Sequence, residues 1–146
     1  MHRDPNLIPL SHQHHNGLVL CVLTRRSLAE DASAANIAAL ARRVIARYEI
    51  ELVNHFEIEE QVLFPLCGEM PVVAALLEEH RAIEALVAQL RAAPSAALLE
   101  QFCALLSGHI RREESEYFEA AQRILPKDVL ERAGCEIDRR AVRAGF

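Results

Sequence analysis

One spacing occurs three times in this chain and restricts what it can fold into: a histidine followed four residues later by a glutamate. On an α-helix, residues four apart lie one above the other on the same face. Each pair can therefore direct an imidazole nitrogen and a carboxylate oxygen to one point in space. The pattern indicates helices that meet around a shared polar site. The three pairs are His55 and Glu59, His80 and Glu84, and His109 and Glu113.

Proline and serine residues divide the chain into long helical segments. Between them, apolar residues recur at intervals of three and four in a sequence rich in Ala, Leu, Arg and Glu. Ser33 and Ser95 suit helix N-caps, and Pro71 suits a first helical turn. We expect helices over residues 10–30, 34–65, 71–92 and 95–124, and a shorter helix or pair of turns after Pro126. Because the connections are short, the sequence predicts an all-α fold, an up-down-up-down four-helix bundle with a short C-terminal helical extension.

Length and composition favour a single globular domain. The chain has 146 residues, of which 51% are hydrophobic, enough for one core. We expect one domain over 1–146, with the bundle over about 10–124 and a helical tail over 126–146. The net charge of −5 disfavours nucleic acid and membrane surfaces as partners, and no segment is typical of a membrane span or a secretory signal. We therefore expect a cytoplasmic protein whose isolated cysteines are reduced thiols.

The histidines and glutamates fall on the apolar faces of the expected helices. In the second helix the apolar stripe continues from Leu52 through His55 to Glu59. The third and fourth helices follow the same pattern, so we expect Glu84 and Glu113 to face inward as well. A buried carboxylate needs a compensating partner, because burying an unpaired charge is costly. Inward His–Glu pairs on three consecutive helices therefore predict a metal site.

Periodicity leaves two positions of this site open. His14 and His15 both lie in apolar surroundings on the first helix, so either can supply its ligand. A second glutamate, Glu60 or Glu114, directly follows the paired glutamate of the second and of the fourth helix. A neighbouring residue is turned by about 100° around a helix. We interpret these two glutamates as rim residues, with Glu114 as an alternative to Glu113.

Four segments in order carry a specific resemblance to a known family. They read PLSHQHHNGLVL at 9–20, HFEIEEQVLFP at 55–65, EEHRAIEALV at 78–87 and HIRREESEYF at 109–118. In these segments the chain resembles the hemerythrin-like, HHE cation-binding family. The resemblance implies a four-helix bundle that holds a non-haem di-iron centre. It also implies ligands at His14 on the first helix, at His55 and Glu59 on the second, and at His109 and Glu113 on the fourth.

The chain differs from the oxygen-carrying hemerythrins on two helices. On the third helix those proteins have a second histidine where this chain has Glu84. On the fourth, their carboxylate is an aspartate five residues after its histidine, whereas Glu113 follows His109 by four. An anionic oxygen in place of an imidazole stabilises Fe(III), so a coordinating Glu84 should lower the reduction potential.

The expected ligands suffice for two metal ions. If two glutamates and an oxo or hydroxo group bridge two six-coordinate ions, roughly six positions remain for five terminal ligands, and one stays open for O2, peroxide or water. This mixed nitrogen and oxygen set favours two Fe ions and is also compatible with Mn or Zn. The set comprises His14, His55, Glu59, His80, Glu84, His109 and Glu113.

Three functions are compatible with such a centre. The first is binding of O2 or a related small oxidant for sensing, storage or delivery. The second is a redox enzyme, for instance one that disproportionates peroxide, and the third is iron sensing or buffering. The sequence contains no HExxH zinc-protease motif, phosphate-binding loop or nucleic-acid motif. It leaves the physiological ligand, the protein partner and the oligomeric state open.

Overall fold

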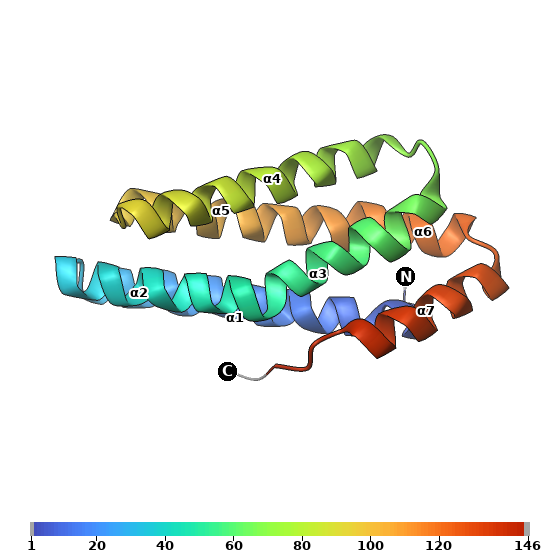
Figure 1. The fold of residues 1–146 in the computed structure, drawn as a ribbon, viewed down its shortest axis with the longest axis horizontal. Helices are drawn as coiled ribbons and strands as arrows, with labels where there is room; N and C mark the ends of the chain where they lie inside the picture. Colours follow the sequence, from blue (N-terminus) through green and yellow to red (C-terminus); the bar gives the residue numbers. More distant parts are fainter. Residues whose placement is uncertain (1, 145–146) are drawn as a thin grey trace.

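The computed structural model describes residues 2–144 and is all-α over this range, as predicted. Met1 and residues 145–146, which end the tail expected over 126–146, lie outside the described part. A short 3-10 turn, η1 (Pro5–Leu7), precedes the first helix. The helices in Figure 1 are α1 (Ile8–Glu30), α2 (Ala34–Arg47), α3 (Val53–Ile58), α4 (Pro71–Ala92), α5 (Ala96–Arg112), α6 (Phe118–Ile124) and α7 (Lys127–Arg140).

Four long rods form the bundle. A π-helical turn joins α2 to α3, and another joins α5 to α6, so each of these pairs is one continuous rod. α1 packs against α2 and α5, and α4 packs against the same two helices (Figure 1). This arrangement matches the helices expected over 34–65 and 95–124, except that no residue pattern indicated the π-helical turns.

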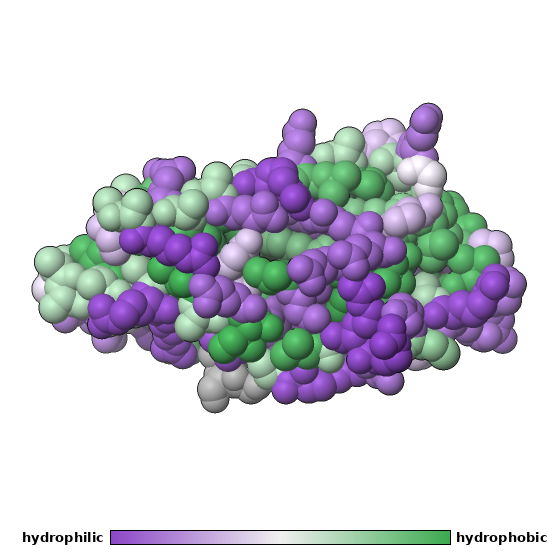
Figure 2. Space-filling view, viewed as in Figure 1, coloured by the Kyte–Doolittle hydropathy of each residue, from purple (hydrophilic) through white to green (hydrophobic). Residues whose placement is uncertain are grey.

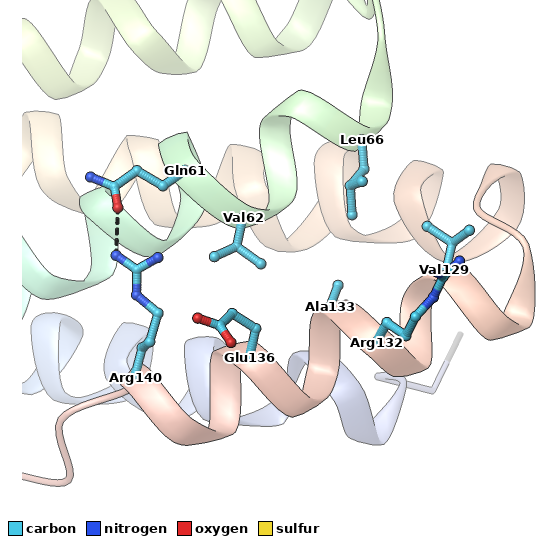
Figure 3. A pocket seen from close by; sticks show the side chains of 8 residues that line it. All are labelled: Gln61, Val62, Leu66, Val129, Arg132, Ala133, Glu136 and Arg140. Carbon is cyan, nitrogen blue, oxygen red and sulfur yellow. Dashed lines mark hydrogen bonds between the residues drawn. The ribbon is translucent and has the colours of Figure 1, made fainter.

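The last helix, α7, closes one end of the bundle. It packs mainly against η1 and also against α1, α3 and the residues after α3. An open groove of about 470 Å³ lies between α7 and residues 61–66 (Figure 3). The Arg140 guanidinium spans one end of this groove and donates a hydrogen bond to Gln61 Oε1 (2.6 Å). The C-terminal extension is thus packed onto the bundle.

Serines and a proline set the helix starts as predicted. Ser33 Oγ accepts a hydrogen bond from the backbone N–H of Asn36 (3.2 Å), and Ser95 Oγ accepts one from Leu98 (3.1 Å). Each serine satisfies an N–H group that the first helical turn leaves without a partner. Pro71 is the first residue of α4, where its missing N–H costs nothing. All three predicted helix starts are confirmed.

Two apolar clusters fill the interior of the bundle, and a polar layer separates them. One cluster contains Leu20 and Val87 and lies towards the turn between α1 and α2. The other contains Leu10 and Tyr117 and extends under α7. On α1, His14 lies between Leu10 of one cluster and Leu20 of the other. On α4, His80 lies between Leu76 and Ile83 in the same way. The fold therefore places its polar layer in a dry interior.

The outer surface mixes polar and apolar side chains. In Figure 2, hydrophilic residues cover much of the middle of the face, and apolar ones gather towards the end where α4 begins. Among the described residues, no helix has both the length and the apolar character that crossing a bilayer requires.

The contact between α7 and η1 can be tested at Gly134. A Cβ at this position would lie 2.6 Å from Asn6 Cβ, too close for two carbon atoms. We expect Gly134→Ala to lower the free energy of unfolding by about 1–3 kcal/mol, measured by urea denaturation. The control is Gly108→Ala in α5, where a Cβ would meet nothing within 4 Å. It should raise stability by up to about 1 kcal/mol. Equal urea midpoints for Gly134→Ala and the unaltered chain would contradict the described docking.

Candidate metal centre

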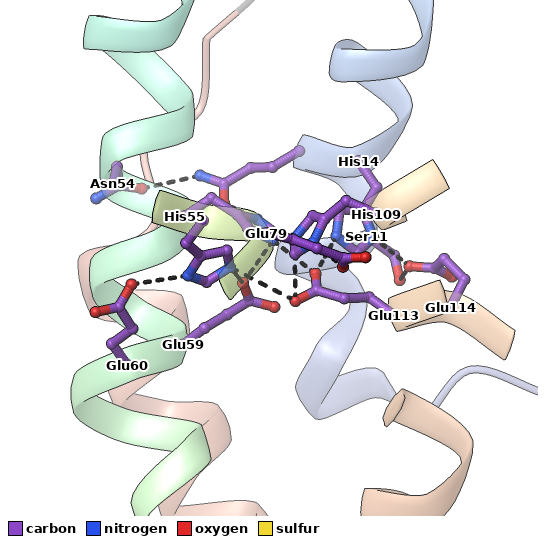
Figure 4. A network of polar contacts seen from close by, with 12 residues as sticks. Ser11, His14, Asn54, His55, Glu59, Glu60, Glu79, His109, Glu113 and Glu114 are labelled. Carbon is purple, nitrogen blue, oxygen red and sulfur yellow. Dashed lines mark hydrogen bonds and ion pairs between the residues drawn. The ribbon is translucent and has the colours of Figure 1, made fainter. Parts of the chain in front are cut away.

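Four histidines, one from each rod of the bundle, meet in the polar layer. Figure 4 labels three of them, His14, His55 and His109. His14 comes from α1, His55 from α3, His80 from α4 and His109 from α5, and none is more than 4% exposed. Each directs its Nε2 atom towards two fully buried glutamates. These are Glu59, which follows α3, and Glu113, which follows α5.

The six side chains form two groups that share both glutamates. In each group the potential ligand atoms lie within 4.8 Å of one another. His14 Nε2 lies 2.7 Å from Glu113 Oε1, and His80 Nε2 lies 3.1 Å from Glu59 Oε1. Two histidine pairs that share two carboxylates suit two neighbouring cations. The first group contains His14 and His55 with the glutamates, and the second contains His80 and His109 with them.

Each shared glutamate begins a π-helical turn. The Glu113 carbonyl accepts the backbone N–H of Phe118, five residues later, and the turn after Glu59 is built in the same way. The wider turn inserts one extra residue, so the residues that follow shift around the rod. After Glu113, this shift brings the Phe118 ring parallel to the His14 ring, with centroids 5.3 Å apart. π-helical turns inside α-helices are frequent at functional sites.

Several buried atoms of the layer have no hydrogen-bond partner in the described part of the chain. Buried polar atoms are almost always satisfied, because leaving one without a partner is costly. Imidazole nitrogen and carboxylate oxygen are both common metal ligands. The residues present therefore fit bound cations. The unpartnered atoms are both carboxylate oxygens of Glu59, Oε2 of Glu113, and Nε2 of His80 and of His109.

Every histidine of the layer is held from behind through its Nδ1 atom. An oxygen acceptor there favours a proton on Nδ1, and in a neutral imidazole this places the lone pair on Nε2, which faces the layer. Metal-binding histidines typically have such a partner. The Nδ1 partners are Glu114 for His14 (2.6 Å), Gln13 for His55 (2.9 Å), Glu60 for His80 (2.7 Å) and Glu79 for His109 (2.9 Å).

The outer and inner carboxylates differ in how their charge is balanced. Each outer carboxylate pairs with an arginine, whereas Glu59 and Glu113 face histidine nitrogens. The inner pair therefore lies beside imidazoles and not beside arginines, and bound cations would neutralise its charge in the dry layer. The outer pairs are Glu114 with Arg3 (3.2 Å), Glu60 with Arg81, and Glu79 with Arg112 (3.1 Å).

Burial and the neighbouring side chains shift the pKa values of these groups in different directions. Burial opposes a charge on His14, but its contacts with Glu113 and Glu114 outweigh burial and raise the pKa of this imidazole. Burial and the neighbouring Glu113 carboxylate raise the pKa of Glu59 well above its usual range. Burial also opposes ionisation of Glu113, but His109 and the other contacts outweigh it and hold its pKa well below the usual range. Burial lowers the pKa of His80 to about 4, so its imidazole is neutral at pH 7. Without a cation, Glu59 retains a proton that a bound metal would displace.

The comparison with protein families agrees with this geometry. The family described as the hemerythrin HHE cation-binding domain matches residues 6–121. The chain belongs to this family. All six side chains of the two groups lie within the matched segment of this hemerythrin domain. Neither the curated proteins nor the solved structures gave a match.

Six of the seven expected ligands come together in the hemerythrin domain, and both open alternatives have a geometric answer. His14 enters the layer, whereas His15 is exposed. Glu113 faces the layer, whereas Glu114 lies behind His14 and also accepts a hydrogen bond from Ser11 Oγ (2.7 Å; Figure 4). That these six side chains bind metal stays a prediction.

Glu84 does not face the layer, and our expectation that it does is wrong. Its side chain is 38% exposed and pairs with Arg81 (3.5 Å). The inward face of α4 runs through His80, Ile83 and Val87, all 0% exposed, at spacings of three and four. Position 84 is therefore turned towards the side of the helix. The lowered reduction potential expected from a coordinating Glu84 has no structural basis.

Sequence reasoning missed two of the residues that hold the histidines from behind. Gln13 precedes His14 in the chain but contacts His55 on another rod. Glu79 precedes His80 in the same way but contacts His109. A residue next to an inward ligand is turned by about 100°, so it can face the adjacent rod. Their place next to an inward-facing histidine was the only sequence feature that could have indicated this role. It does not indicate which rod such a residue contacts.

Glu59 and Glu84 give a matched test of the two groups. We expect Glu59→Gln to weaken metal binding by about 10-fold or more, because a neutral amide replaces a carboxylate common to both groups. In the metal-free protein it should raise the melting temperature at pH 7, because it removes a buried group whose charged form is disfavoured. Glu84→Gln should bind metal normally. Elemental analysis and thermal unfolding measure both effects, and equal metal loss in the two variants would contradict the assignment.

Glu79 and its neighbour test the outer contacts. Glu79→Gln exchanges a carboxylate for an amide behind His109, so the imidazole becomes a weaker donor to metal. We expect about 10- to 100-fold lower metal affinity, measured by competition with a chelator. Glu78→Gln removes the same charge from an exposed position and is the control. If both variants weakened metal binding equally, general charge rather than the contact with His109 would be responsible.

Proposed function

We propose that this protein is a non-haem di-iron protein that binds O2 or a related small oxidant within its helical bundle. The observation that carries the proposal is the pair of histidine groups that share Glu59 and Glu113 and leave buried ligand atoms without partners. The mixed nitrogen and oxygen set favours iron, and Mn or Zn fit the same donor atoms. When bound, the two irons would supply the redox-active positions at which a small oxidant binds.

The two histidine pairs assign the ligands of each ion. In our proposal His14 and His55 would hold one ion, His80 and His109 would hold the other, and Glu59 and Glu113 would be available to both. Each ion would then have four protein ligands, which is fewer than the six that iron usually accepts with such ligands, so positions would remain for a small exogenous ligand.

Aromatic rings and the apolar clusters keep water from the site. The Phe56 ring stacks on His80, with centroids 3.9 Å apart, and the Phe64 ring lies parallel to the same imidazole on another side. These contacts also fix the plane of the imidazole. Because Glu59 and Glu113 are fully buried, a ligand that reaches them must be small. This restriction favours O2 or peroxide over larger substrates.

Tyr117 is a buried, uncharged neighbour of the proposed site. Its side chain is fully buried, and its hydroxyl lies 3.2 Å from Cys67 Sγ. Burial and the nearby Cys67 raise the pKa of Tyr117, so the phenol keeps its proton at neutral pH. The phenol adds no negative charge beside the two glutamates.

The cysteines fit a reducing compartment, which is part of our proposal. All four are free thiols, three of them buried and Cys135 exposed. Cys21 and Cys103 face one another across α1 and α5, with each Sγ within 3.9 Å of the other's carbonyl oxygen. Free thiols in such proximity are typical of cytoplasmic proteins. A role in oxygen or redox sensing, storage or delivery is consistent with this location.

Optical spectroscopy of the diferrous protein tests the proposed function. We expect a charge-transfer band that appears with O2 and disappears when O2 is removed, and no band in Glu59→Gln. Rapid evolution of O2 from added peroxide would instead identify a redox enzyme at the same centre. Loss of the fold on mild chelation, without any band, would identify iron sensing or buffering. Either result would overturn the proposal of a small-oxidant carrier or sensor.

A further inference from the structure

The chain continues past its family match and returns to the polar layer. The match ends at residue 121, whereas the described chain runs through α7 to residue 144. Residues 141–144, which we call the C-terminal strap, follow α7 and contact side chains of α1 and α3. Gln13 donates a hydrogen bond to the Val142 carbonyl (3.2 Å), and Asn16 donates one to the Ala144 carbonyl (3.0 Å). The strap thus lies directly over Gln13, the partner of His55.

The strap fixes the orientation of Asn54. The backbone N–H of Val142 donates to Asn54 Oδ1 (2.9 Å), and Asn54 Nδ2 donates to the Arg140 carbonyl (3.0 Å). A flipped Asn54 amide would place its NH2 group against the Val142 N–H and its oxygen against a carbonyl. The end of α7 and the strap therefore allow one orientation of this amide, with its oxygen also facing Gln13.

Asn54 and the strap together fix the orientation of Gln13. Its Nε2 donates to Asn54 Oδ1 (2.9 Å) and to the Val142 carbonyl, which are both acceptors. Gln13 Oε1 must therefore face His55 Nδ1, 2.9 Å away. An oxygen in that place requires a proton on His55 Nδ1, and in the neutral imidazole the lone pair is then on Nε2. Figure 4 shows Asn54 beside His55, with its oxygen joined to a neighbouring amide nitrogen.

His55 is the only one of the four histidines whose proton depends on an amide. The other three donate to carboxylates, which accept hydrogen bonds in any orientation. An amide presents either an oxygen or an NH2 group, and an NH2 group would oppose the Nδ1 proton. The Gln13 amide must therefore be held with its oxygen towards His55, and the strap holds it in that orientation.

We propose that the C-terminal strap is a positioning element for His55 and thereby controls how firmly the ion held by His14 and His55 is bound. This inference rests on the proposed di-iron function. It makes the two metal positions unequal, because the strap contacts the partner of His55 and not those of His80 or His109. Release of the ion beside His55 should therefore depend on the C-terminal strap, and release of the other ion should not.

Substitutions at Val142 separate the strap's hydrogen bond from its side chain. Val142→Pro removes the N–H that orients Asn54, and Ala141 already has a backbone conformation that a following proline accepts (φ −67°, ψ 126°). Val142→Ala keeps the N–H and is the matched control, since this residue is 37% exposed. Two shortened chains give a second comparison: one ends after Arg140 and lacks the strap, and the other ends after Ala144 and keeps it.

The experiment measures metal release from the iron-loaded protein to a chelator. We expect Val142→Pro, and the chain ending after Arg140, to release one of two ions about 10-fold faster or more, with the second ion released at the original rate. Val142→Ala and the chain ending after Ala144 should behave like the unaltered protein. Unchanged release in Val142→Pro would overturn the proposal, because the strap would then affect neither ion. Equal acceleration of the release of both ions would also overturn it, because the strap would then affect the whole fold.

A measurement on the metal-free protein keeps this inference separable from the proposed function. Nuclear magnetic resonance of ¹⁵N-labelled histidines reports the proton on His55 Nδ1. We expect it to exchange with solvent about 10-fold faster or more in Val142→Pro than in Val142→Ala, with the signals of His80 and His109 unchanged. If the unaltered protein bound no iron, but the His55 proton still exchanged faster in Val142→Pro than in Val142→Ala, the proposed di-iron function would be wrong and the positioning of His55 by the strap would be supported. Identical His55 signals in both variants would refute the strap's role.

Discussion

The structure depends on two carboxylates, Glu59 and Glu113, that are fully buried in the middle of a helical bundle. Apolar clusters lie on both sides of them, so water cannot stabilise their charge. A buried charge of this kind destabilises a fold unless a cation or a proton compensates it. The histidines beside them present nitrogen donors to the layer, and the low pKa of His80 keeps that imidazole neutral, so it supplies no positive charge. Metal ions between the pairs would meet this requirement and use every unpartnered atom of the layer.

The residues behind the histidines show that the layer is organised beyond its innermost side chains. Three carboxylates accept the Nδ1 protons of His14, His80 and His109, and arginines at the surface balance the charge of these carboxylates. Three histidines are therefore oriented by groups that contribute no net charge to the interior. The fourth, His55, depends on Gln13 and through it on the C-terminal segment. Residues far from the six innermost side chains thus help to orient the histidines of the site.

Much of this arrangement follows from the sequence, because helical periodicity determines both the rods and their inward faces. The spacing of His55 and Glu59 and of His109 and Glu113 predicted side chains that do face one layer. The same spacing failed for Glu84, because the inward stripe of α4 continues through Ile83 instead. A four-residue step advances about 40° around a helix, so a pair that straddles the edge of the buried face has one member outside it.

The features that the sequence did not reveal depend on contacts between rods. π-helical turns at Glu59 and Glu113 rest on backbone hydrogen bonds that no residue pattern signals. The contact of Gln13 with His55 joins residues 42 positions apart. Such contacts depend on which rods are adjacent and on their rotation, which tertiary packing decides. Conversely, the helix starts at Ser33 and Ser95 are local, and the sequence predicted both.

Anomalous diffraction at the iron absorption edge, from crystals of the iron-loaded protein, would show whether Glu59 and Glu113 hold two ions. We predict two peaks in the polar layer, both contacting Glu59 and Glu113, one beside His14 and His55 and the other beside His80 and His109. A single peak outside the layer, or fully loaded crystals with the layer free of anomalous signal, would contradict it.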